Sequence, residues 1–117
     1  MMISLPKKSA VMVSLLLLVA AVSLPVYAQT TRTLQGQVMK GGDAPVPGAI
    51  VYLKNTKTLS VRSFTSDDKG NYRFPSLSPN VDYEVYAVHE GNKSDTKTLS
   101  AFDSRALATI NLKVNSK

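Results

Sequence analysis

Residues 65–74 read TSDDKGNYRF. Asp67 and Gly70 favour a tight turn, because an aspartate side chain accepts hydrogen bonds from nearby backbone N–H groups and a glycine readily adopts positive φ. After the turn, Tyr72 and Phe74 alternate with polar residues, which predicts a strand that directs both rings to one face. The segment therefore predicts a strand end, a turn and a second strand whose rings enter a hydrophobic core.

Short runs of alternating apolar and polar residues lie on both sides of this segment, and turn residues separate them about every 8–12 positions. They predict strands at residues 33–40, 49–54, 59–65, 71–74, 83–89, 96–99 and 109–114. After the first thirty residues, no sustained period of 3.6 residues indicates an α-helix. The pattern therefore predicts an all-β sandwich of seven strands.

Several positions refine this assignment. Gly36, inside the first predicted strand, indicates a bulge or a close approach of two backbone segments. Pro75 is expected to end the fourth strand, and Leu77 lies just beyond that end, where it can close the core. Residues 102–106 are compatible with either one helical turn or a long connection.

The N-terminal segment has the three parts of a secretory signal peptide. Lys7 and Lys8 supply positive charge, residues 10–24 form an apolar run, and cleavage is expected between Ala28 and Gln29. An uncleaved N-terminal anchor is the alternative, although the apolar run is short for a membrane span. The chain is thus predicted to comprise a signal peptide at residues 1–28, a flexible lead-in at 29–32 and one domain at 33–117.

The composition excludes several classes of function. The 117 residues include no cysteine and carry a formal net charge of +6. Without cysteine the chain has no thiol nucleophile, no disulfide framework and no zinc site with thiolate ligands. The basic residues are scattered rather than gathered in a block with aromatic residues, so they indicate a solubilising surface and no nucleic-acid partner.

Four segments resemble one known family. They are LQGQV at residues 34–38, PGAIVYL at 47–53, the segment 65–74 with Leu77, and YEV at 83–85. Together they resemble the carboxypeptidase regulatory-like domain. The resemblance implies a prealbumin-like (transthyretin-like) Greek-key sandwich, grouped with Cna B-type and carbohydrate-binding-like folds. It also implies an accessory role beside other proteins rather than catalysis.

Candidate catalytic and metal-binding residues are few. His89 is the only histidine, which excludes a two-histidine metal site and the histidine-rich site of transthyretin-like hydrolases. Asp43, Asp67 and Asp68 supply carboxylates, but they lack the dense alternation of a calcium-binding loop. We therefore predict no catalytic residue, no metal, no cofactor and no enzymatic activity.

Some Cna B-type relatives form an isopeptide bond between a lysine and an asparagine, assisted by a buried acid. Lys40, Asn111 and Glu84 are the nominal counterparts here. Asn111 and Glu84 alternate with the apolar residues of their predicted strands, so both are expected to face solvent. The pattern therefore argues against such a bond.

Tyr52 and Tyr86 are the predicted contact residues. Each alternates with inward-facing residues, and the resemblance makes their strands neighbours, which places both rings on one outer face with Ile50 and Val88. Such a pair can stack on sugar rings, anchor a protein, or serve only as a stabilising cross-strand pair.

These observations predict a non-catalytic structural or interaction module, exported to the periplasm or the cell exterior, with an unknown protein partner. The alternative is a carbohydrate-binding module that contacts a cell-surface polysaccharide through the outer face around Tyr52 and Tyr86. Contact with a membrane is expected only through the signal peptide, before its cleavage.

Overall fold

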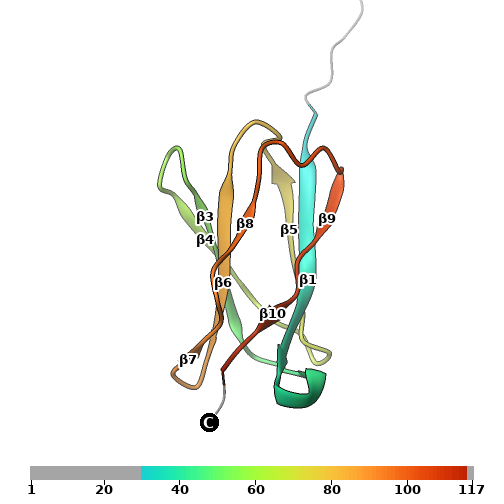
Figure 1. Ribbon diagram of the computed structural model, residues 1–117, viewed down its shortest axis with the longest axis vertical. Coiled ribbons are helices and arrows are strands. Elements are labelled where there is room, and N and C mark those ends of the chain that lie inside the picture. The colour runs from blue at the N-terminus through green and yellow to red at the C-terminus, as the bar shows by residue number, and fades with distance from the viewer. Residues whose placement is uncertain (1–29, 116–117) are drawn as a thin grey trace, which may run out of the picture.

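β1 (Arg32–Lys40) is the central strand of the first of two β-sheets in the computed structural model, which describes residues 30–115 (Figure 1). β5 (Asn71–Leu77) pairs antiparallel with one edge of β1. The other edge of β1 pairs parallel with two short strands, β9 (Leu107–Thr109) and β10 (Leu112–Lys113). A strand from the middle of the domain and the C-terminal segment therefore flank its first strand.

A short hairpin extends the end of β1. The 3-10 turn η1 (Gly41–Asp43) leads into the two-residue strand β2 (Ala44–Pro45), which pairs antiparallel with β1. The backbone N–H of Val46 then donates to the carbonyl of Val38 at 2.9 Å.

The second sheet packs across the first, and its strands pair antiparallel throughout (Figure 1). Its order is β4 (Val61–Thr65), β3 (Ile50–Asn55) and β6 (Tyr83–His89), followed by β7 (Asn92–Lys93) and β8 (Lys97–Leu99), which both pair with β6. No helix within residues 30–115 is long and apolar enough to cross a membrane.

Alternate residues of both sheets fill one hydrophobic core. The largest fully buried side chains are Tyr72, Phe74, Leu34, Leu53, Leu77, Leu99, Leu112, Val38, Val46, Val51 and Val85. Most of them recur at intervals of two or four residues along their strands, and this period directs side chains to one side of a sheet. Val46 lies in the connection after β2, and Leu77 follows a register shift in β5. The prediction of an all-β sandwich is therefore confirmed.

The last predicted strand, residues 109–114, is divided in two. β9 ends at Thr109 and β10 begins at Leu112. The backbone N–H of Ile110 still donates to the carbonyl of Gln35 at 2.9 Å, and the pairing with β1 is interrupted between the Ile110 carbonyl and Asn111. Gly36 explains the interruption, because the carbonyl of Ile110 comes so close to its Cα that a Cβ there would lie 1.9 Å from the carbonyl oxygen. The close approach predicted at Gly36 is present. Residues 102–106 form a connection without a helix.

The prediction that Pro75 ends its strand is wrong. β5 continues through Pro75 to Leu77, whose side chain is buried. Its register with β1 shifts by one residue before Leu77, and Ser76 has φ 62°. A proline is tolerated here because β5 is an edge strand, where a missing N–H removes no pairing partner.

The predicted strand at 59–65 begins only at Val61. Leu59 has φ 66°, and its backbone N–H donates to the carbonyl of Asn55 at 2.7 Å, which closes the turn between β3 and β4. Leu59 is therefore a turn residue.

The prediction of a flexible lead-in at residues 29–32 is wrong for Arg32. Arg32 is the first residue of β1 and is only 3% exposed. Its guanidinium donates hydrogen bonds to four backbone carbonyls, those of Ser78, Val81, Ser100 and Asp103. The predicted signal peptide at 1–28 and its cleavage site at Ala28 and Gln29 lie outside the described residues.

We expect Gly36→Ala to lower the free energy of unfolding by about 3 kcal/mol, because its Cβ would collide with the backbone of Ile110 and with the Tyr72 ring, 2.7 Å away. Gly41→Ala is the matched control, since a Cβ there meets nothing within 4 Å, and it should change stability by less than about 0.5 kcal/mol. Urea unfolding followed by circular dichroism measures both values. Equal effects of the two substitutions would contradict the role assigned to Gly36.

Candidate functional site

The turn before β5 uses its aspartate internally. Asp67 Oδ1 accepts the backbone N–H groups of Lys69 and Asn71, both at 2.9 Å, and Gly70 donates to the Asp67 carbonyl with φ 77°. The Asp67 carboxylate therefore holds the turn, and Asp68 beside it is exposed. This turn delivers Asn71 to the outer face of β5 and Tyr72 to the inner face.

Tyr72 places a polar atom inside the sandwich. Its ring is 2% exposed and its hydroxyl donates to the Ile110 carbonyl at 2.5 Å. Burial raises the pKa of the Tyr72 phenol far above its ordinary value, because the phenolate would lose its hydration. Phe74, equally buried, packs at 5.9 Å between ring centroids.

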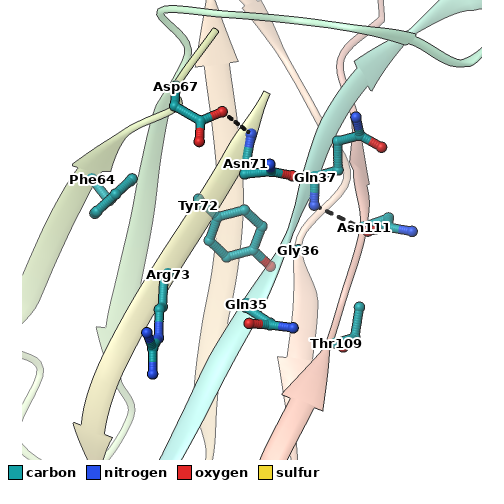
Figure 2. Close-up of a pocket in the computed structure, with 10 residues that line it drawn as sticks. All are labelled: Gln35, Gly36, Gln37, Phe64, Asp67, Asn71, Tyr72, Arg73, Thr109 and Asn111. Atoms are coloured by element: carbon teal, nitrogen blue, oxygen red, sulfur yellow. Dashed lines mark hydrogen bonds between the residues drawn. The ribbon is translucent and has the colours of Figure 1, made fainter. Parts of the chain in front are cut away.

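Outward side chains of β1, β5 and β9 line an open groove of about 530 Å³ on the first sheet (Figure 2). We call it the amide groove, because four of its lining residues are amides: Gln35, Gln37, Asn71 and Asn111. The exposed residues Arg73 and Thr109 lie on the same face, and Phe64 of β4 lies at its edge. The groove offers neutral donors and acceptors with one cation, Arg73, and one carboxylate, that of Asp67.

Asn111 has a structural role in this groove. Its Oδ1 accepts the backbone N–H of Gln37 at 3.0 Å, at the point where β9 has ended and β10 has not begun (Figure 2). Gln37 in turn donates from its side chain to the carbonyl of Lys69 at 2.8 Å. Sequence reasoning missed the groove, although the polar alternation in three separate strands was the signal available.

The outer face of the second sheet carries the predicted tyrosines. Tyr52 lies directly opposite Tyr86 in the β3–β6 register, and Ile50 lies opposite Val88. The tyrosine rings stack with centroids 5.3 Å apart and planes at 29°. We call these four residues the tyrosine face. Ile50 is 40% exposed, and the other three are half-buried.

Lys93 covers the second side of Tyr86. Its Nζ lies 4.5 Å from the ring centroid, and it belongs to β7, on the opposite side of β6 from Tyr52. Tyr86 is therefore held between an aromatic ring and a cation, and neither of its flat sides is open to a sugar ring. The geometry of Tyr86 suits contacts through its ring edge and hydroxyl better than stacking of a sugar.

The nominal isopeptide residues do not form a buried cluster. Lys40 and Asn111 are exposed, and half-buried Glu84 lies on β6 in the second sheet, opposite Lys54 and Thr98. The expected outward placement of Asn111 and Glu84 agrees with these positions.

The remaining ionisable candidates are scattered. His89 Nε2 lies 4.0 Å from Glu90, and exposed Asp43 forms an ion pair with Lys113 at 3.4 Å. Within residues 30–115, no group of three or more histidine, aspartate or glutamate side chains could hold a metal ion. Hydrogen bonds from Arg105 lower the pKa of Asp103 to about 2, but this pair is a local contact of an exposed connection.

The two-sheet topology defines a prealbumin-type sandwich, and sequence comparison assigns the family. The model of the carboxypeptidase regulatory-like domain matches residues 33–114, so the chain belongs to that family. Among curated proteins, none matches the chain.

Several solved structures share the fold. The pilus 2b backbone protein of group B streptococcus is 16% identical with a TM-score of 0.56, covering 73% of this chain and 41% of that one. The shaft pilin SpaA of Lactobacillus rhamnosus GG is 14% identical with a TM-score of 0.58, covering 75% and 47%. The 3-chlorocatechol 1,2-dioxygenase of Rhodococcus opacus 1CP is 11% identical with a TM-score of 0.61, covering 77% and 61%.

This chain therefore spans less than two thirds of each of these three proteins. At such identities the likeness concerns the fold alone, and the fold occurs in pilins and in dioxygenases alike. A function for this chain has to be argued from its own surfaces.

We expect Tyr72→Phe to destabilise the domain by about 1–2 kcal/mol at neutral pH, because it removes the hydroxyl that pairs the Ile110 carbonyl. The phenol of Tyr72 stays neutral when folded and ionises when unfolded, so its contribution is complete below about pH 10 and is lost as the pH rises beyond that. The stability difference between wild type and variant, measured by urea unfolding, should therefore shrink between about pH 8 and about pH 11. An unchanged difference would contradict this assignment.

Proposed function

We propose that this chain is a non-catalytic, exported interaction module that binds a protein partner through the tyrosine face. The observation that carries the proposal is the apolar character of both sides of β3 and β6. Val51 and Val85 enter the core, and their neighbours Tyr52 and Tyr86 form an apolar outer surface. A surface of this kind is typical of a sheet that a partner covers.

The comparison with ordinary antiparallel sheets supports this interpretation. A sheet with one face in water usually alternates apolar and polar residues, whereas strands covered on both faces contain nearly continuous apolar runs. Residues 49–53 read AIVYL and residues 85–88 read VYAV. Exposed Ile50 and half-buried Val88 extend the tyrosine pair, so the apolar surface is contiguous rather than a single exposed residue.

Export and the absence of catalysis rest on other grounds. The charged and apolar segments before Ala28 support export, and membership of the carboxypeptidase regulatory-like family supports an accessory role.

The absence of native cysteine allows a single thiol to be placed beside the tyrosine face. Thr98→Cys lies on β8 opposite Glu84, next to this face, and Ala106→Cys lies beside the first sheet. We expect a photo-crosslinker on residue 98 of the mature chain to capture one protein from the exported fraction of producing cells, and the same crosslinker on residue 106 to capture none.

Competition makes this result specific. An excess of unlabelled wild-type protein should prevent formation of the crosslinked conjugate. The unlabelled Ile50→Lys variant should compete for the partner at least about tenfold less well. The unlabelled Thr109→Lys variant, which adds the same charge to the other sheet, should compete like wild type. A conjugate that Ile50→Lys displaces as well as wild type does, or a conjugate with a second copy of this chain, would overturn the proposal.

The amide groove favours a second candidate function, carbohydrate binding. Each asparagine or glutamine side chain offers an acceptor and two donors in one plane, which matches neighbouring hydroxyls of a sugar. Gln35 and Asn71 lie on adjacent strands of the groove, and Phe64, 39% exposed at its edge, supplies an apolar surface. The sequence suggested sugar binding around Tyr52 and Tyr86 as an alternative, and the amide groove is the position that we propose for it.

Proton–nitrogen correlation spectra test this candidate directly, because side-chain amide groups give separate signals. A bound oligosaccharide should shift the signals of Gln35, Gln37 and Asn71, and leave that of Asn92, which lies outside the groove, unchanged. Gln35→Ser combined with Asn71→Ser should abolish binding. Shifts confined to the tyrosine face, or no shift with any neutral or acidic oligosaccharide tested, would refute it.

A further inference from the structure

The edges of the two sheets differ in how well they are protected from pairing with another strand. β5 carries Pro75 and a register shift before Leu77. β9 and β10 are three and two residues long with a break between them. β7 and β8 are equally short and carry Lys93 and Lys97. Proline, irregularity, shortness and charged side chains, lysine above all, are features by which edges avoid pairing.

β4 contains no proline, no lysine and no register shift, and its one charged side chain, Arg62, lies over the Phe74 ring of β5. Its five residues, VRSFT, pair with β3 without a register shift, and no described strand pairs with its other edge. All five side chains are exposed, with Val61 at 57% and Phe64 at 39%. Val, Phe and Thr are residues that favour strands. β4 is therefore a complete strand at the end of its sheet with an open backbone edge (Figure 1).

We propose that β4 pairs antiparallel with β4 of a second copy of this chain, in a register centred on Ser63. This register places Ser63 opposite Ser63 of the second copy, Arg62 opposite Phe64, and Val61 opposite Thr65. All five residues of each strand are then paired, and the second sheets of the two copies join into one continuous sheet.

The side chains of β4 favour this particular register. Arg62 and Phe64 share one side of β4, opposite Leu53 and Val51 of β3, so they can face each other across the new pairing. Arg62 already lies over an aromatic ring, with its Cζ 5.7 Å from the Phe74 centroid. In the proposed register each Arg62 meets an aromatic ring, whereas a register centred on Arg62 would place two cations directly opposite each other, which is destabilising.

The choice of a second copy over another partner follows from this self-complementarity. A two-fold axis through Ser63 satisfies every pair in both directions, as an isologous interface requires. The dimer uses the edge of β4 and leaves the tyrosine face uncovered. The dimer proposal can therefore be tested independently of the proposed function.

Disulfide trapping tests the register. Ser63→Cys creates the only thiol in the chain, and directly opposite residues of antiparallel strands have Cα atoms about 4.5–5.5 Å apart, within reach of a disulfide. Mild oxidation of the mature protein should convert Ser63→Cys to a covalent dimer. Thr65→Cys alone should remain monomeric, since its opposite residue is Val61, and Val61→Cys combined with Thr65→Cys should restore the covalent dimer.

Charge exchange at the same pairs tests the interface without a covalent bond. Val61→Lys with Thr65→Lys places like charges opposite each other and should weaken dimerisation at least about tenfold, whereas Val61→Lys with Thr65→Glu places opposite charges together and should retain it. Both substituted residues are exposed, so the fold should persist, as circular dichroism can verify.

Sedimentation of the wild type over a wide concentration range gives the reference dissociation constant. A wild type that remains monomeric at every concentration, equal trapping of Ser63→Cys and Thr65→Cys, or equal effects of the two charge variants would each overturn the proposal. Pairing of β4 with an added peptide in place of a second copy would overturn it as well.

Discussion

The hydroxyl of Tyr72 is a polar group in a hydrophobic core, and its need for a partner shapes the first sheet. The hydroxyl donates to the Ile110 carbonyl, and the bare Cα of Gly36 allows that carbonyl to come close. The parallel pairing of the C-terminal segment with β1 is interrupted at this point, and Asn111 satisfies the N–H of Gln37 with its side chain. Asn111 also lines the amide groove, so a requirement of the core influences one feature of the surface.

Arg32 plays a comparable role at the opposite end of β1. Its guanidinium is buried, and four backbone carbonyls from two connections accept its hydrogen bonds. Its Cζ also lies 5.9 Å from the centroid of the Tyr83 ring. A planar group with five donors can satisfy several carbonyls at once, which lysine cannot do with the same geometry. Arg32 thereby joins β1 to the connections that follow β5 and β8.

Alternation along single strands predicted most of the core, because the period of two residues is a local property of the chain. It predicted neither the extension of β5 past Pro75 nor the buried Arg32, since each depends on partners distant in sequence. The outward placement of Tyr52 and Tyr86 was accessible to the same reasoning, but the Lys93 contact that covers Tyr86 was not. The amide groove combines three strands, and only their pairing order brings those side chains together.

Edge pairing through β4 would alter how the tyrosine face meets a partner. The two-fold axis is perpendicular to the joined sheet, and directly paired residues of antiparallel strands lie on the same side of a sheet. The outer faces of the two second sheets would therefore lie on the same side of the dimer. Ile50 and Tyr52 of both copies would then form one surface on the same side of the dimer. A partner with repeated sites, such as a polymeric assembly, would be held at two points, and the second contact would be intramolecular. Weak binding by each tyrosine face would then suffice for stable attachment, which is consistent with faces that are apolar but small.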